Sequence, residues 1–198
     1  MDKQREKIEQ TIAEHLEVVS SLNEACGAVL EVLVQRTEAA LRAGGKICFF
    51  GNGGSAADAQ HLATEFVVRY TRQRAALAAI AFTTDTSALT AGGNDFGFES
   101  IFARQVEALC GSDDVVVGIS TSGFSPNVSA GLAAAKKIGA LTVLFTGQPG
   151  GEAARVTGQV DLILAAPSEV TARIQECHLL AGHILCDLVE EAFADGGK

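Results

Sequence analysis

A chain of 198 residues, 47% of them hydrophobic, is long enough to bury one substantial core, and we expect a single domain over residues 1–198. The formal net charge of −9 at pH 7 argues against nonspecific binding to nucleic acid or to anionic membranes. Residues 1–7 carry no apolar segment typical of a secretory signal, and no apolar run is long enough to span a membrane. Five cysteines, an odd number without a C-x-x-C pair, indicate free thiols in a reducing compartment. Together these features predict a cytoplasmic protein without nucleic-acid or membrane partners.

The first 43 residues have the pattern of helices, with no Pro and with Gly27 as their only Gly. Ile8, Ile12, Leu16 and Val19 recur at helical spacing, and we expect Gly27 to separate two helices. Two interpretations are open for this region: additional cover for one domain, or a surface through which subunits pack.

Strands and helices alternate after Gly44 and Gly45, which is typical of a parallel sheet covered by helices on both faces. The expected strands lie near residues 46–50, 77–82, 114–119, 140–145 and 160–164. The expected helices lie near residues 56–69, 86–92, 98–109, 126–137 and 170–194. We therefore predict a three-layer α/β fold with a five-stranded parallel sheet of flavodoxin-like strand order, preceded by the N-terminal helices.

A glycine-rich turn at residues 50–55 follows the first expected strand and opens the next helix. Its glycines allow backbone N–H groups to approach a ligand closely, and the positive end of the helix dipole faces the same place. Farther along this helix, His61 and Glu65 are spaced i, i+4 and share one face. The pattern fits an anion-binding turn beside an acid–base or metal pair. It also fits a tight turn followed by a hydrogen-bonded pair on a solvated face.

A second loop, Ser120 to Asn127, follows the apolar strand expected near 114–119 and precedes an Ala-rich helix. Ser125 is a natural N-cap, and Pro126 stands at the first helical position. A loop that only caps the helix accounts for these two residues. It does not account for the hydroxyls of Ser120, Thr121 and Ser122 at the carboxyl end of a strand, where open α/β sheets bind ligands. Hydroxyls, backbone N–H groups and the helix dipole favour a phosphate site here.

The two loops, GNGGSAADAQH and STSGFSPN, resemble those of the sugar isomerase (SIS) family, and within it the chain looks like the phosphoheptose isomerases. The likeness extends over essentially the whole chain. It implies the SIS fold and a homotetramer with active sites at subunit contacts, so that the first 43 residues would serve oligomer packing. It also implies conversion of sedoheptulose 7-phosphate to D-glycero-D-manno-heptose 7-phosphate through an enediol, the first step of nucleotide-activated heptose synthesis for lipopolysaccharide or surface polysaccharide.

The same resemblance assigns residue roles. Glu65 and His183 are the implied catalytic residues, which transfer protons. Two imidazoles, a carboxylate and an amide oxygen would hold one zinc ion per subunit. These metal ligands are His61, Glu65, Gln175 and His183. The implied contacts to the sugar phosphate are Asn52, Gly53, Gly54, Ser55, Glu65, Asn94, Asp95, Ser120, Thr121, Ser122, Ser125 and Gln175. The chain departs from the family at Phe124, a loop position that is usually polar, which leaves the substrate range open.

His178 lies roughly 140° from His183 around the last expected helix, so we expect it to be a packed or exposed helix residue that does not serve the same site. Some SIS relatives have lost catalysis and act as interaction proteins, including one that assists the bacterial replication initiator. A different sugar-phosphate isomerase, or a sugar-phosphate-binding regulator with the same loops, is another alternative. Because the chain keeps Glu65 and His183 together with His61 and Gln175, we favour the enzyme.

Overall fold

The computed structural model describes residues 2–148, 150, 158 and 160–194 of the chain. Within them a five-stranded sheet has the order β2-β1-β3-β4-β5, and every neighbouring pair of strands is parallel. The strands are β1 (Ile47–Gly51), β2 (Ala79–Ala81), β3 (Val115–Ile119), β4 (Leu141–Gly147) and β5 (Leu162–Ala166). This order is the flavodoxin-like one, so the predicted fold class is confirmed.

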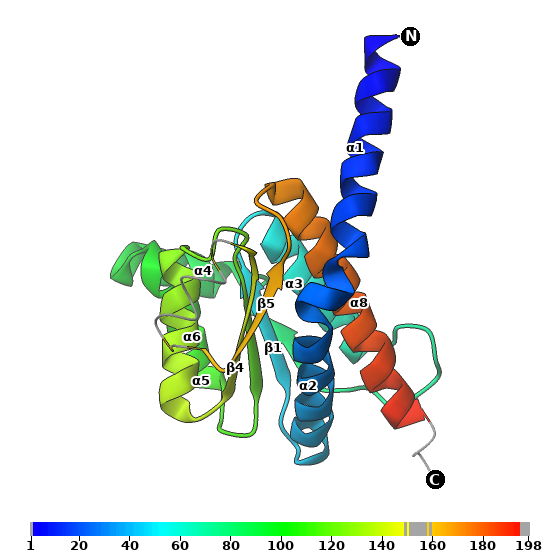
Figure 1. The fold of residues 1–198 in the computed structure, drawn as a ribbon. Helices are drawn as coiled ribbons and strands as arrows, with labels where there is room; N and C mark the ends of the chain where they lie inside the picture. Colours follow the sequence, from blue (N-terminus) through cyan, green and yellow to red (C-terminus); the bar gives the residue numbers. More distant parts are fainter. Residues whose placement is uncertain (1, 149, 151–157, 159, 195–198) are drawn as a thin grey trace.

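Helices cover both faces of the sheet, as the alternating pattern predicted (Figure 1). One face carries α2 (Leu22–Arg42), α3 (Gly54–Val67) and α8 (Thr171–Ala194). The other carries α4 (Thr86–Phe96), α5 (Ile101–Leu109) and α6 (Pro126–Ile138), with the short 3-10 helix η1 (Phe98–Ser100) before α5. Because side chains alternate along a strand, Phe49 packs into the first layer and Phe50 into the second.

The N-terminal region forms two helices, but the predicted break at Gly27 is wrong. The first helix, α1 (Lys3–Ser20), is capped by Ser21, and Gly27 lies inside α2. Leu22, Cys26 and Leu30 all face the core from α2. Burying this apolar stripe keeps α2 continuous past its glycine, whose helical cost of about 1 kcal/mol is smaller than the gain from that burial.

α1 contributes no buried residue and extends away from the three layers (Figure 1). Its middle is attached to α8, because His15 Nδ1 lies 2.7 Å from Glu176 Oε2 and Arg173 Nη1 donates to the carbonyl of Thr11 at 2.6 Å. No helix in the described part of the chain is both long and apolar enough to cross a membrane.

Candidate active site

The first loop leads from β1 directly into α3. Gly53 adopts a φ of 56°, a conformation that favours glycine, and it precedes the first helical residue, Gly54. A Cβ atom on Gly54 would lie 2.3 Å from Gln175 Nε2, so this side chain of α8 rests against the start of α3 and would have to move aside for a larger residue. Two predicted site residues, Gly54 and Gln175, are therefore in contact, and Ser55 is buried in the first turn beside them.

A pair of amide side chains ties the two predicted loops together. Asn52 Nδ2 donates to Asn127 Oδ1 at 2.9 Å, and Asn127 Nδ2 donates back to Asn52 Oδ1 at 2.8 Å. Asn127 is 2% exposed. No role for Asn127 is predicted from the sequence. The available signal was a polar residue in the first turn of a helix that packs on the sheet.

The second loop is held by its own hydroxyl groups. Ser120 Oγ donates to Ser125 Oγ at 3.0 Å and accepts from the Gly123 N–H at 3.2 Å. Ser122 Oγ accepts from the Phe124 N–H at 3.2 Å. As predicted, Ser125 is the N-cap of α6 and Pro126 is the first residue of that helix. Phe124 is 62% exposed, so its ring does not fill the loop.

Gly123 controls the path of this loop. Its φ is 74°, and a Cβ atom there would lie 2.4 Å from Gly150 Cα. The carbonyl of the neighbouring Thr121 accepts a hydrogen bond from the Gly147 N–H at 2.9 Å, which joins the loop to the end of β4. Within the described residues, the backbone N–H groups of Ser122 and Ser125 form no hydrogen bond. Two donors thus remain for an anion at the α6 N-terminus.

A cavity of about 220 Å³ opens between the two loops and η1. Its lining residues are Asn52, Phe98, Glu99, Ser125, Pro126 and Asn127. The cavity lies outside the carboxyl ends of β1 and β3, the place where open parallel sheets bind ligands.

The predicted acid–base residues meet where α3 lies beside α8. His61 Nε2 is 2.8 Å from His183 Nε2, and it is 3.6 Å from Glu65 Oε1. The two imidazoles form an N–H···N hydrogen bond in which one ring donates and the other accepts. Tyr70 stacks on His183 with ring centroids 5.4 Å apart. The structure therefore brings together His61, Glu65 and His183, and adds an aromatic neighbour that the sequence analysis did not name.

A buried carboxylate positions the segment that carries Tyr70. Glu190, 1% exposed on α8, accepts the backbone N–H groups of Tyr70, Thr71 and Arg72 at 2.7–2.8 Å. Burial acts to raise the pKa of Glu190, but these N–H donors outweigh it and lower the pKa to about 2. Arg74 Nε lies 3.4 Å from Glu190, and Arg74 Nη2 donates to the carbonyl of Glu65 at 2.7 Å. Glu190 thereby holds the loop against both Glu65 and His183.

The predicted zinc ligands come from two helices that run in the same direction. Gln175 contacts Gly54 and His183 contacts His61, so Gln175 lies two turns before the imidazole pair. Two nitrogens bound to one tetrahedral zinc ion are about 3.4 Å apart, so a small separation of the rings makes room for an ion. The donor set fits zinc chemically, and Gln175 would have to turn from Gly54 to join it.

Two further predictions concern residues outside this cluster. Asn94 and Asp95 are exposed on α4, where Asn94 Nδ2 donates to Asp95 Oδ1 at 2.7 Å. No hydrogen bond in the described residues joins them to either loop. His178 is fully buried, and its Nε2 donates to the carbonyl of Thr146 at 3.0 Å. Of the two expected settings, packed or exposed, the structure shows the packed one, and burial lowers the pKa of His178 to about 4.

Comparisons with known proteins agree with this architecture. A model of the SIS domain matches residues 10–147. The phosphoheptose isomerase of Paramagnetospirillum magneticum is 54% identical over 187 residues, which cover 94% of this chain and 96% of that protein. That of Aquifex aeolicus is 50% identical, with 94% of this chain and 96% of that protein covered. The solved structure of phosphoheptose isomerase from Neisseria gonorrhoeae superposes with a TM-score of 0.88 at 39% identity, covering 96% of this chain and 100% of that one.

Proposed function

The chain belongs to the phosphoheptose isomerases of the SIS-domain family, and from this premise we propose that it converts sedoheptulose 7-phosphate to D-glycero-D-manno-heptose 7-phosphate. The reaction would proceed through an enediol. It would supply the first step of nucleotide-activated heptose synthesis for lipopolysaccharide or surface polysaccharide, in the cytoplasm.

One observation carries this proposal. The carboxylate of Glu65 and the imidazoles of His61 and His183 lie together about 10 Å along α3 from the first loop. That loop is hydrogen-bonded through Asn52 to the helix of the proposed phosphate site. An extended chain advances about 1.2 Å per covalent bond, so carbon 1 of a heptose 7-phosphate lies about 10 Å from its phosphorus. A phosphate held at the α6 N-terminus would therefore leave carbons 1 and 2 within reach of Glu65 and His183.

Phosphate binding would rest on the second loop. Two features favour phosphate binding there. The N–H groups of Ser122 and Ser125 form no hydrogen bond within the described residues, and the positive end of the α6 dipole lies at the same loop. The hydroxyls of Ser120, Thr121, Ser122 and Ser125 would supply further hydrogen bonds. The first loop, with Asn52, Gly53, Gly54 and Ser55, would line the sugar, and Asn94 and Asp95 would hold its hydroxyls.

Proton transfer would be divided between two residues. Glu65 would remove the proton from carbon 1 of the open-chain ketose and return it to carbon 2. His183 would protonate oxygen 2 and accept the proton of oxygen 1, with His61 available as its hydrogen-bond partner at 2.8 Å. Such positioned acid–base groups contribute about 10²–10⁴-fold to a rate.

A zinc ion would be held by His61, Glu65, Gln175 and His183. When bound, it would polarise the substrate carbonyl. A carboxylate bound tightly to zinc is a weaker base, so the proton-transfer role of Glu65 and its role as a ligand compete. This competition makes the effect of chelation on turnover an informative measurement.

The proposed assembly is a homotetramer. α1 displays Ile8, Ile12 and Leu16, which are 54–61% exposed and share one face of the helix. A stripe of this kind on a helix that extends from the fold is suited to packing against other copies of the chain.

The test is incubation of the purified protein with sedoheptulose 7-phosphate while the aldoheptose phosphate is followed by NMR. Conversion is expected. Its absence, both with and without added zinc, would contradict the proposal and favour a protein that only binds sugar phosphate or a partner. Glu107→Gln, at an exposed carboxylate on α5, is the matched control for substitutions at Glu65.

A further inference from the structure

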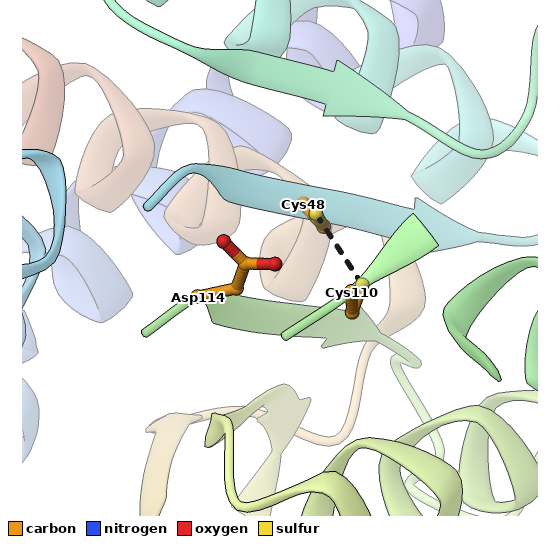
Figure 2. A group of neighbouring side chains, drawn as sticks. All are labelled: Cys48, Cys110 and Asp114. Carbon is orange, nitrogen blue, oxygen red and sulfur yellow. Dashed lines mark hydrogen bonds between the residues drawn. The ribbon is translucent and has the colours of Figure 1, made fainter. Parts of the chain in front are cut away.

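A second group of side chains that could hold a metal ion lies toward the amino ends of β1 and β3. Cys48 is in β1, Cys110 follows α5, and Asp114 precedes β3. Their sulfur and oxygen donor atoms all lie within 4.8 Å of one another. Figure 2 shows the two thiols facing each other with the Asp114 carboxylate beside them. We propose that Cys48, Cys110 and Asp114 bind a thiophilic divalent metal ion of the zinc class, at a site separate from the isomerase centre.

The spacing of the two sulfur atoms suits such an ion. The Cys48 and Cys110 Sγ atoms are 3.7 Å apart. Two thiolates at about 2.3 Å from a tetrahedral zinc ion are separated by about 3.8 Å. A disulfide would instead require the two sulfurs to approach to about 2.05 Å. The pair is therefore already spaced for a shared metal ion.

The third donor is oriented by an outer set of hydrogen bonds. Asp114 Oδ1 accepts the backbone N–H of Lys46 at 2.8 Å. Asp114 Oδ2 accepts from the Gly111 N–H at 2.7 Å and from Lys46 Nζ at 2.6 Å. Oδ1 accepts only one of these bonds, so a lone pair remains for a metal ion. Carboxylate ligands held in this way by second partners are typical of metal sites.

The charges of the group balance when a divalent ion is added. Two thiolates and one carboxylate carry −3, and the ion together with the Lys46 ammonium carries +3. Binding would exchange the two thiol protons for the metal, so no net charge is left beside the buried Cys48 and Asp114.

A cavity borders one member of the group. A cavity of about 510 Å³ at the amino ends of β3, β4 and β5 includes Asp114 in its lining. Cys110 is partly exposed, whereas Cys48 is fully buried. An ion would therefore reach Asp114 and Cys110 first and leave its fourth position to water.

The experiment is a Co²⁺ titration of the protein, reduced with a phosphine, with all thiols counted beforehand. Thiolate-to-metal charge-transfer absorption is expected at about one ion per chain. The imidazole and carboxylate site around His61 has no sulfur ligand, so it produces no such band. Cys110→Ser should abolish the band, and Asp114→Asn should weaken binding at least about 10-fold. The matched control Cys177→Ser, at a buried thiol of α8, should keep it.

A wild type without the band at saturating Co²⁺ would overturn the proposal, as would a folded Cys110→Ser variant that keeps it. Loss of the band is also expected in Cys48→Ala, so a single variant that fails to fold does not decide the result. The band should also be retained in His61→Ala. Its loss in that variant would assign the band to the site around His61 and contradict the proposal. None of these measurements uses isomerase activity, so failure of the proposed function would be seen separately.

Discussion

Glu65 offers the sharpest single substitution, because glutamine has nearly the same shape but cannot accept a proton. Glu65→Gln is expected to lower kcat by about 10²–10⁴-fold while the protein stays folded, and His183→Gln should do likewise. Steady-state kinetics with circular dichroism measure both effects. Glu107→Gln should retain full turnover. Near wild-type rates in both site variants would remove Glu65 and His183 from the mechanism.

The same two variants also probe the metal. If Glu65 and His183 are zinc ligands, calorimetric titration of either variant should show weaker zinc binding than the wild type, and unchanged affinity would exclude that role. Turnover that survives chelation in the wild type but is lost in Glu65→Gln would assign proton transfer to Glu65. Turnover that disappears on chelation and returns with zinc would instead assign the metal a role in turnover.

His178 is expected to make the folded protein sensitive to acid. Its pKa falls from 6.5 to about 4 in the folded state, so the unfolded chain binds a proton at a higher pH than the native chain does. Stability from this residue is complete above pH 6.5 and is lost as the pH falls toward 4, by about 3 kcal/mol in total. Urea unfolding of the wild type and of His178→Gln from pH 7 to 4.5 measures the difference. Curves that stay parallel would contradict this assignment.

At the scale of elements, the phosphate loop depends on how β3 passes into α6. Ser122→Ala or Ser125→Ala removes a hydroxyl from that junction and should weaken phosphate-ester binding by about 1–2 kcal/mol. The corresponding rise in KM is about 5- to 30-fold. Ser129→Ala, at an exposed position one turn farther along α6, is the matched control. Unchanged KM values in both loop variants would place the phosphate elsewhere.

The segment between α3 and β2 depends on one carboxylate of α8. Glu190→Gln replaces a charged acceptor of three N–H groups by a neutral one and should destabilise the protein by about 3 kcal/mol. Hydrogen exchange of residues 70–74 should rise as Tyr70 loses its position against His183. Thermal unfolding and exchange mass spectrometry test this expectation. Unchanged exchange in the segment would show that Glu190 does not hold it.

At the scale of the whole molecule, α1 is the surface through which we propose that copies of the chain associate. Leu16→Glu places a charge in its apolar stripe and should convert the proposed tetramer to a smaller species. The fold of each chain should persist, because α1 has no buried residue. Light scattering after size-exclusion chromatography gives the mass. Gln10→Glu, at an exposed position on the other face of α1, should leave the mass unchanged. A Leu16→Glu variant with wild-type mass would exclude this surface.

The sequence by itself determined the elements whose signals are local. Short apolar runs located the five strands, and their alternation with helices predicted the parallel sheet and its layers. Ser125 and Pro126 predicted the start of α6, and the i, i+4 spacing put His61 and Glu65 on one face. Such signals act over a few residues of backbone, so they survive in any tertiary setting.

Only the tertiary structure decided which side chains meet. Asn52 pairs with Asn127, Glu190 caps the backbone at Tyr70, and Cys48 meets Cys110, each across 62 to 120 residues of chain. The break expected at Gly27 failed for the same reason, since burial of one face of α2 outweighs its local helix preference. Contacts of this kind depend on how whole helices pack against the sheet. No short stretch of sequence contains that information, because each partner's signal lies in a different element.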